Sequence, residues 1–253
     1  MLQQERHNQI LARLNLEGQV RVKDLSKDFN VTEDCIRKDL NILEKANKLK
    51  RIHGGATCMR SNLHTVNVSQ RRDVRVEEKK AIALKAIELI KPGMMIFLDI
   101  STVTLEIAKL IYQRNLKITV VTNMIDIMEI FTRDCNTNLI FIGGELNRAR
   151  DGFIGAITIE QIKKYKFDLS FLGVVGIDVF NNKVATYDIN DGLTKKEVLN
   201  ASRKCYMAGE TIKFELDGNY LFGDISDFSG YICEGGLDSR IENKLKDVGI
   251  EII

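Results

Sequence analysis

The most constraining feature of this chain of 253 residues is a series of short apolar runs that alternate with helical patterns. The runs predict four buried strands, over residues 94–98, 118–122, 139–142 and 168–175. Amphipathic patterns predict helices over residues 79–90, 104–111 and 125–131. Strands that alternate with helices are typical of a mostly parallel sheet covered on both faces. We therefore expect a Rossmann-like α/β domain over residues 77–253.

The first 56 residues show only short helical patterns. Ile10, Leu11 and Leu14 share one face of a first helix, which Gly18 ends as a C-terminal cap. A second helix is expected from about residue 22 to 28, and Thr32 is placed to cap a third. This third helix carries four residues on one face: Ile36, Leu40, Leu43 and Asn47. Two short helices, a tight turn and a third helix predict a helix-turn-helix.

The opposite face of the third helix carries two cations and an asparagine. Such a helix fits the DNA major groove, where Arg can pair with guanine and Asn with adenine. Gly54-Gly55 then permits a hairpin with three basic groups, suited to phosphate contacts. A solvated charged surface is the alternative, which the three-helix context disfavours. The predicted DNA-binding residues are Thr32, Arg37, Lys38, Asn41, Lys50, Arg51 and His53.

Composition narrows the classes of protein. The formal net charge is only +2, but residues 1–82 hold 17 Lys/Arg against 11 Asp/Glu, whereas the rest is mildly acidic. This asymmetry fits a small anion-binding module joined to a larger domain, with chance as the alternative. The scattered cysteines and histidines predict reduced thiols, no metal site and no cofactor. A polar start and short apolar runs predict no signal peptide, no membrane contact and a cytoplasmic location.

Small and polar residues follow each predicted strand. Ligands of parallel sheets bind beyond the carboxyl ends of the strands, and the amides and hydroxyls of a helix N-terminus bind anions. The strand-end residues singled out on this basis are Asp99, Ser101, Thr102, Thr104, Asn123, Arg148 and Gly155. Each position alone is better explained as a helix cap or a turn. Together they fit a phosphorylated, hydroxyl-rich small molecule.

Farther along the chain, Asp188, Asp191 and Lys195 lie within eight positions of one another. Two carboxylates and a lysine at this spacing can bind sugar hydroxyls or carry out acid–base chemistry. A charged loop that leads into a helix is the alternative. The spacing alone leaves all three interpretations open.

Several motifs resemble the DeoR family of bacterial transcriptional regulators. They are Glu5-Arg6-His7, Ile36-Arg37-Lys38-Asp39-Leu40, His53-Gly54-Gly55-Ala56, Phe97-Leu98-Asp99, Val121-Thr122-Asn123, Gly143-Gly144 and Phe171-Leu172-Gly173. The resemblance implies a winged helix-turn-helix joined to a sensor domain that is similar in fold to sugar-phosphate isomerases. It also implies a phosphosugar effector near the strand-end residues and near four others: Asp188, Asp191, Lys195 and Lys213.

A few positions depart from the family pattern. Ser101 stands where the family usually has Gly, and both Val103 and Cys35 stand where it usually has Thr. Serine cannot adopt every backbone state of glycine, and valine lacks a hydroxyl. Late in the chain, Glu210-Thr211-Ile212 replaces a run of Asp-Ser-Ser. These departures predict a reshaped phosphate pocket or an unusual ligand.

We expect a DNA-binding domain over residues 1–56, a linker over 57–76, and an effector-sensing and oligomerisation domain over 77–253. The leading hypothesis is a repressor of sugar-metabolism genes, not an enzyme, whose binding to operator DNA a sugar phosphate controls. Operators with repeated half-sites imply a homo-oligomer, either a dimer or a tetramer. One alternative is a sugar-phosphate isomerase that uses Asp188, Asp191 and Lys195. Another is a DNA-binding protein whose sensor has decayed into an oligomerisation domain.

Overall fold

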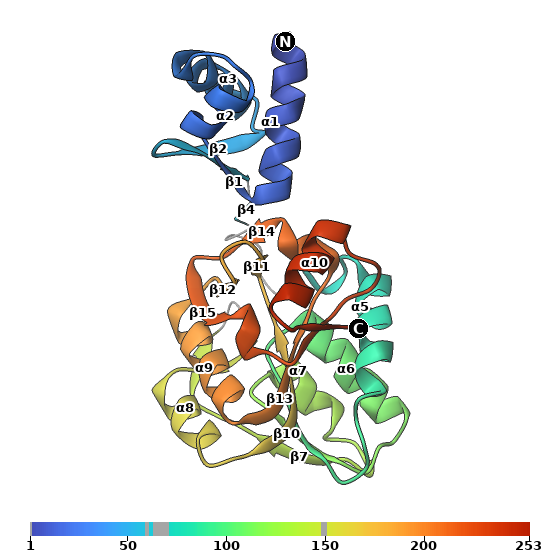
Figure 1. Ribbon diagram of the computed structural model, residues 1–253. Helices are drawn as coiled ribbons and strands as arrows, with labels where there is room; N and C mark the ends of the chain where they lie inside the picture. The colour runs from blue at the N-terminus through green and yellow to red at the C-terminus, as the bar shows by residue number, and fades with distance from the viewer. Residues whose placement is uncertain (1, 59–60, 63–70, 148–150) are drawn as a thin grey trace. The chain divides into compact units, whose positions relative to one another are not determined.

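The computed structural model describes residues 2–58, 61–62, 71–147 and 151–253 (Figure 1). The chain divides into two compact units, Met1–Ser61 and Asn62–Ile253. The last long strand of the first unit ends at Cys58, two residues beyond the expected boundary at 56. Much of the expected linker, residues 59–60 and 63–70, lies outside the described residues. The first helix of the second unit begins at Val76.

The first unit is a three-helix module with a small antiparallel sheet. Its elements are α1 (Gln3–Glu17), β1 (Gln19–Arg21), α2 (Val22–Asp28), α3 (Glu33–Lys45), β2 (Leu49–Ile52) and β3 (Gly55–Cys58), and the short β4 (Ser61–Asn62) spans the boundary between the two units. The sheet has the order β1-β3-β2. Gly18 caps α1 with a φ of 76°, and the Thr32 hydroxyl accepts a bond from the Cys35 amide at 3.2 Å, as the sequence predicted.

One residue of the first unit was assigned wrongly from the helical spacing. Asn47 lies beyond the end of α3, with a φ of 53° and an exposed side chain. The other three residues of that face, Ile36, Leu40 and Leu43, are buried against α1 and α2 in one apolar core. The helix ends two residues before Asn47, so the face is shorter than the spacing suggested.

The hairpin between β2 and β3 turns through His53 and Gly54. Gly54 has a φ of 77°, which favours glycine, and no neighbour lies within 4 Å of where its Cβ would stand. Gly55 is already in β3, opposite Arg21 of β1. A Cβ on Gly55 would lie 2.0 Å from the Val20 carbonyl oxygen, so the strands approach too closely there for any side chain.

The second unit is built on a seven-stranded sheet in which every neighbouring pair is parallel. Its strands, in spatial order, are β17 (Glu251–Ile252), β16 (Gly230–Ile232), β13 (Ser202–Ala208), β10 (Phe167–Gly173), β5 (Met95–Leu98), β6 (Thr119–Thr122) and β7 (Asn138–Phe141). The sequence predicted β5, β6, β7 and β10 and missed the other three. The mostly parallel α/β fold is confirmed.

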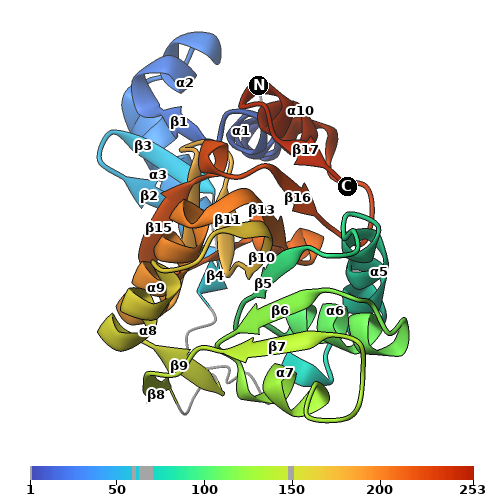
Figure 2. The same ribbon diagram turned by 90° about the horizontal axis from the view of Figure 1, so that it is seen from below.

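Helices cover both faces of this sheet (Figures 1 and 2). On one side lie α5 (Val76–Ile87), α6 (Thr102–Gln113) and α7 (Ile125–Ile130); on the other lie α8 (Ala156–Ile162), α9 (Ile189–Asn200) and α10 (Ser239–Asp247). Alternate residues of each strand lie on opposite faces of the sheet and pack in the two cores. Ile96 and Leu98 pack with α6, whereas Phe97 between them packs with α8 and α9.

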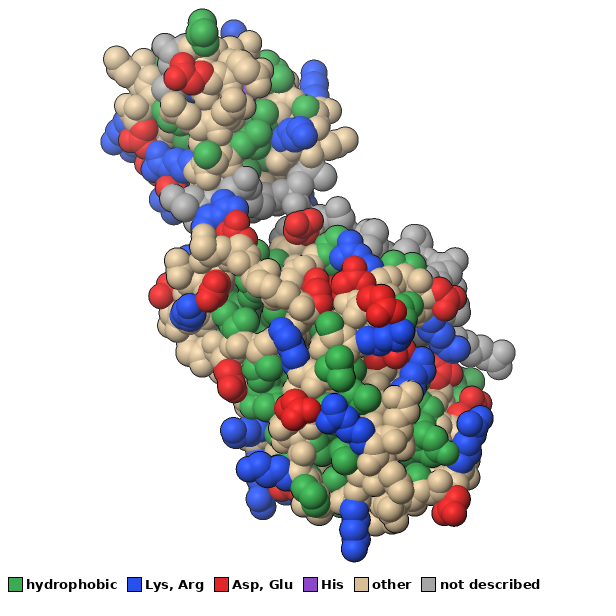
Figure 3. Space-filling model, turned by 90° about the vertical axis from the view of Figure 1, so that its right-hand side faces the viewer, with side chains coloured by type: hydrophobic (Ala, Val, Ile, Leu, Met, Phe, Trp, Pro, Cys, Tyr) green, Lys and Arg blue, Asp and Glu red, His purple; other side chains and the backbone are tan. Residues whose placement is uncertain are grey.

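Shorter elements complete the second unit. They are the hairpin β8 (Glu145–Asn147) and β9 (Gly152–Ile154), the antiparallel sheet of β11 (Gly176–Asp178), β12 (Lys183–Thr186) and β15 (Tyr220–Asp224), the strand β14 (Leu216–Asp217), and the 3₁₀ turns η1 (Thr211–Phe214) and η2 (Ile225–Asp227). The face drawn in Figure 3 shows acidic and basic side chains interspersed over this unit. None of the described helices is long and apolar enough to cross a membrane.

The order of the central strands reverses between β5 and β10. From β5 the chain adds β6 and then β7 toward one edge, and it returns to place β10, β13, β16 and β17 on the other side. In open α/β sheets, ligands bind beyond the carboxyl ends of the strands at such a switch point. The topology therefore points to the segments that follow β5 and β10.

Candidate functional site

A small cleft of about 30 Å³ opens at this switch point. It lies beyond the carboxyl ends of β5, β10 and β13, and α6 and α9 begin beside it. Its polar lining comes from Arg71, Ser101, Thr102, Thr186, Asp191, Lys195, Glu210 and Lys213. Five of these eight residues were predicted as effector-binding from the sequence; Arg71, Thr186 and Glu210 were not.

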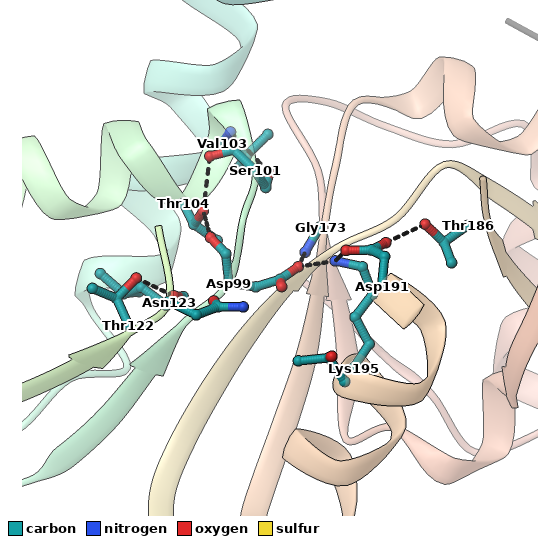
Figure 4. Close-up of polar contacts among 12 residues, drawn as sticks. Asp99, Ser101, Val103, Thr104, Thr122, Asn123, Gly173, Thr186, Asp191 and Lys195 are labelled. Carbon is teal, nitrogen blue, oxygen red and sulfur yellow. Dashed lines mark hydrogen bonds and ion pairs between the residues drawn. The ribbon is translucent and has the colours of Figure 1, made fainter. Parts of the chain in front are cut away.

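A buried charged cluster forms the floor of the cleft (Figure 4). The ammonium of Lys195 donates to the Asp99 carboxylate and lies 3.6 Å from Asp191 Oδ1. The Gly173 amide donates to the same Asp99 oxygen at 3.0 Å, and the Thr186 hydroxyl donates to Asp191. Asp99 and Lys195 are 96 positions apart in the chain. The fold thus joins residues that local patterns identified separately.

The cluster contains two carboxylates and one ammonium, so its charges do not cancel. Burial raises the pKa of Asp99, and the nearby negative charge of Asp191 adds to the rise, while Lys195 opposes it. One ammonium is therefore shared between two carboxylates in a low-dielectric environment. Such an arrangement is typical of sites that bind or exchange polar ligands.

The turn between β5 and α6 forms one wall of the cleft. The Ser101 hydroxyl caps α6 by accepting a bond from the Val103 amide at 3.1 Å. Ser101 has a φ of −159°, an extended conformation that any residue adopts, so serine meets no backbone strain at this position. The Val103 side chain is buried in the core and contributes an apolar surface to the cleft. The departures from the family pattern thus place a serine hydroxyl and an apolar valine side chain on this wall.

The remaining effector-binding candidates are not among the described residues that line the cleft. The Thr104 hydroxyl donates to the Asp99 carbonyl at 2.6 Å, and the Asp188 side chain caps α9 through the Asp191 amide at 3.0 Å. Gly155, with a φ of 89°, precedes α8. Arg148 lies outside the described residues.

Asn123 differs from these residues. It is fully buried, and its side-chain amide donates to the Phe153 carbonyl at 2.7 Å. Its Oδ1 has no hydrogen-bond partner among the described residues. A buried acceptor of this kind needs a donor such as a hydroxyl or a water molecule.

In the first unit, the predicted DNA-binding side chains lie mostly on the surface. Lys38 is exposed on α3, and Lys50, Arg51 and His53 are exposed on the hairpin, while Asn41 is half-buried. The Arg37 guanidinium pairs with Glu33 at 2.6 Å and with Asp34 at 2.7 Å, and its side chain is half exposed. Exposed pairs of this kind contribute little and exchange easily for a phosphate or a base.

Sequence reasoning gave no role to one buried cluster in this unit. The Asp39 carboxylate accepts bonds from Arg6 Nε at 2.5 Å and Nη2 at 3.1 Å, and His7 Nε2 lies 3.0 Å from it. Burial by itself would raise the pKa of Asp39, but these hydrogen bonds outweigh it and hold the pKa below the ordinary value of 3.8. The cluster joins α1 to α3. Its signal was a lone aspartate between Ile36 and Leu40, on the apolar side of the helix.

The sequence matches two family models. Residues 6–62 match the DeoR-like helix-turn-helix domain, and residues 74–234 match the DeoR C terminal sensor domain. The chain is 33% identical over 257 residues to the uncharacterized HTH-type transcriptional regulator YulB of Bacillus subtilis (strain 168), a match that covers 100% of this chain and 96% of that protein. It is 32% identical over 227 residues to the glycerol-3-phosphate regulon repressor of Escherichia coli (strain K12), covering 89% and 88% of the two chains.

Solved structures show weaker similarity. Ribose 5-phosphate isomerase A from Neisseria gonorrhoeae aligns with 55% of this chain and 53% of its own, at 14% identity and a TM-score of 0.40. The eIF2B delta subunit from Chaetomium thermophilum aligns with 66% and 59% of the two chains, at 14% identity and a TM-score of 0.46.

Proposed function

Since the chain belongs to the DeoR family of DNA-binding transcriptional regulators, we propose that it represses genes of sugar metabolism under the control of a phosphorylated sugar. The observation that carries this proposal is the cleft at the switch point of the larger unit. It combines the N-terminus of α6, two lysines and several hydroxyl and carboxylate groups. Cations and helix amides suit a phosphate, while the carboxylates suit sugar hydroxyls.

The relatives support the same proposal from a different direction. One is named as the glycerol-3-phosphate regulon repressor of Escherichia coli, and another as the lactose phosphotransferase system repressor of Lactococcus lactis subsp. lactis, which is 27% identical over 218 residues. Both names join repression to the uptake or use of small carbon sources. We infer the same class of regulated genes for this chain.

Control requires that the effector bind one state of the protein better than another. A coupling free energy of about 1–3 kcal/mol changes operator affinity by roughly 5–150-fold. We further propose that two or more copies bind an operator with repeated half-sites, because each chain carries one helix-turn-helix. Such a regulator works where the chromosome lies, and this places it in the cytoplasm.

An isomerase-like activity finds less support in the site. Asp188 caps α9 through the Asp191 amide and does not line the cleft, so only two of the three proposed catalytic groups reach it. The full-length relatives are named as transcriptional regulators and repressors. The chain is accordingly a regulator and not an enzyme.

A thermal-shift screen of the full chain against phosphorylated sugars, with the free sugars as controls, tests the proposal. A ligand at 100 times its Kd stabilises the folded state by about 2.7 kcal/mol. We expect one phosphosugar to raise the Tm and its free sugar to leave it unchanged. The same compound should then alter binding to DNA fragments selected in vitro with this protein. No shift with any phosphosugar, or equal shifts with the free sugars, would contradict the proposal and favour a sensor that only joins subunits.

A further inference from the structure

A further cation reaches the cleft from an unexpected part of the chain. Arg71 lies five residues before α5, at the start of the larger unit. Its side chain lines the same cleft as Lys213 and as Ser101 and Thr102 at the N-terminus of α6. The cleft therefore joins residues that are far apart in the sequence, since Arg71 precedes α5 and Lys213 follows β13.

Positive charge is concentrated around Arg71. Lys79 is almost fully buried, and its ammonium donates to the backbone carbonyl of Arg71 and lies 3.5 Å from that of Arg72. Lys213 is also shielded from solvent, with Glu210 at 3.7 Å. Burial lowers the pKa of both lysines, the charge of Arg71 lowers it further, and Glu210 opposes these effects. Arg71, Lys79 and Lys213 thus bring three cations to this side of the cleft, where an anionic ligand would meet favourable charge.

The segment that carries Arg71 is fixed to the larger unit at several points. Lys79 of α5 holds the two carbonyls. The neighbouring guanidinium of Arg72 bonds to Asp126 of α7 and, at 3.1 Å, to Asp151 just before β9. Arg71 therefore stands at the cleft on an anchored piece of backbone.

We propose that Arg71 binds the anionic group of the effector together with Lys213 and the N-terminus of α6, so that the residues just before α5 form part of the ligand site. A guanidinium presents a planar pair of donors that matches phosphate oxygens, and the helix N-terminus adds amides and a favourable dipole. This inference rests on the proposed function, because it names a further residue of the same site. It also gives the ligand a direct contact with the chain that continues toward the DNA-binding unit.

Phosphate titrations of the full-length protein test this assignment, with inorganic phosphate as the probe and the Tm as the readout. The variants are Arg71→Ala, Arg71→Lys and Lys213→Ala. The matched control is Arg203→Ala, because the Arg203 side chain is 75% exposed and lies beside Asp168. We expect Arg71→Ala and Lys213→Ala to weaken phosphate binding about tenfold or more, equal to about 1.4 kcal/mol. Arg71→Lys should restore part of the affinity, and Arg203→Ala should bind as the wild type does.

A second readout reports on the segment itself. Amide hydrogen exchange at residues 76–79 should slow when phosphate binds to the wild type and to Arg203→Ala, and it should stay unchanged in Arg71→Ala. Circular dichroism without phosphate shows that each variant is folded.

The possible outcomes separate the two proposals. Normal phosphate binding by Arg71→Ala together with loss in Lys213→Ala would overturn the role of Arg71 and leave the sensor site in place. A wild type that binds no phosphate, or unchanged binding in both variants, would contradict the anion site as a whole. Protection at residues 76–79 that persists in Arg71→Ala would also overturn the role of Arg71.

Discussion

Both units of the protein contain an aspartate that is almost completely buried, Asp39 in the first and Asp99 in the second, and these two aspartates behave in opposite ways. Asp39 in the DNA-binding unit meets a guanidinium that donates to it twice and an imidazole, and its pKa falls below the ordinary value. Asp99 in the sensor unit shares one lysine with Asp191, and its pKa rises. Both carboxylates are 1% exposed, so burial alone does not explain the difference.

The difference lies in how fully each carboxylate is paired. The Asp39 cluster is closed, and its energetic role is to hold α1 against α3. The Asp99 cluster lies against a cleft and keeps a surplus of negative charge at its floor. The closed cluster stabilises the packing of the helices, whereas the candidate DNA contacts of this unit are other side chains that are mostly exposed. The incompletely paired Asp99 cluster, in contrast, belongs to the candidate ligand site itself.

The largest effect is expected for Asp39→Asn. Removing one partner of a buried ion pair leaves the Arg6 charge uncompensated, and we expect the DNA-binding unit to lose about 3 kcal/mol of stability. Calorimetry of the full chain would show the transition of this unit at a lower temperature. Asp34→Asn on the same helix is the control, because its side chain is 81% exposed, and it should stay within about 0.5 kcal/mol. Equal effects of the two variants would break the contrast between the closed cluster and the surface.

The next effect concerns the surface that Asp39 supports. Arg37→Ala should cost about 1–3 kcal/mol at the cognate operator and less on random DNA, if Arg37 contacts a base. Fluorescence anisotropy with both DNAs measures the difference. An equal loss on both would make Arg37 a phosphate contact.

A smaller effect on stability is expected for Asp99→Asn. The folded protein disfavours the charge of Asp99, so a neutral amide of the same shape should cost less stability than Asp39→Asn does, while Lys195 keeps Asp191 as its partner. Phosphosugar binding should weaken in the same variant. A loss of stability as large as that of Asp39→Asn would show that the two clusters are equivalent.

The pH dependence of the two units should differ in sign for these groups. The contribution of Asp39 is fully present above its ordinary pKa of 3.8 and is lost as the pH falls below it. The contribution of Asp99 to the stability of the folded state changes in the opposite direction. Because its pKa is raised in the folded protein, folding becomes less favourable as the pH rises above 3.8. Melting curves at falling pH, compared between the wild type and the two asparagine variants, measure each slope.

The smallest effect belongs to the hairpin. Lys50→Ala and Arg51→Ala should each weaken binding to all DNA sequences alike and reduce the slope of affinity against salt by about one. Lys246→Ala on α10 is the control, because its side chain is 62% exposed on the sensor unit. Unchanged slopes in the two hairpin variants would remove the hairpin from the phosphate contacts.

Local patterns were sufficient where an element has regularly spaced apolar residues or a run of mostly apolar ones. They placed α2 and the strands β5, β6, β7 and β10. They missed β13 because its polar start, Ser202-Arg203-Lys204, hides the apolar half that follows. The strands β16 and β17, at one end of the sheet, have three and two residues, too few for any periodicity to appear.

The site was predicted in parts and not as a whole. Asp99 and Lys195 each stood out locally, but their contact depends on the strand order, which periodicity does not reveal. Lys213 came only from the family resemblance. Arg71 carried no signal beyond an arginine-rich stretch, because its role depends on which cleft the segment reaches in three dimensions.

The two adjacent glycines of the hairpin set different limits on how this family member can vary. Gly54 is needed for its dihedral angle, so an asparagine, which tolerates the left-handed region, is an acceptable replacement there. Gly55 is needed for lack of volume, because even one carbon atom would overlap the Val20 carbonyl. Neutral substitution is therefore possible at Gly54 but not at Gly55, although both positions hold the same residue type.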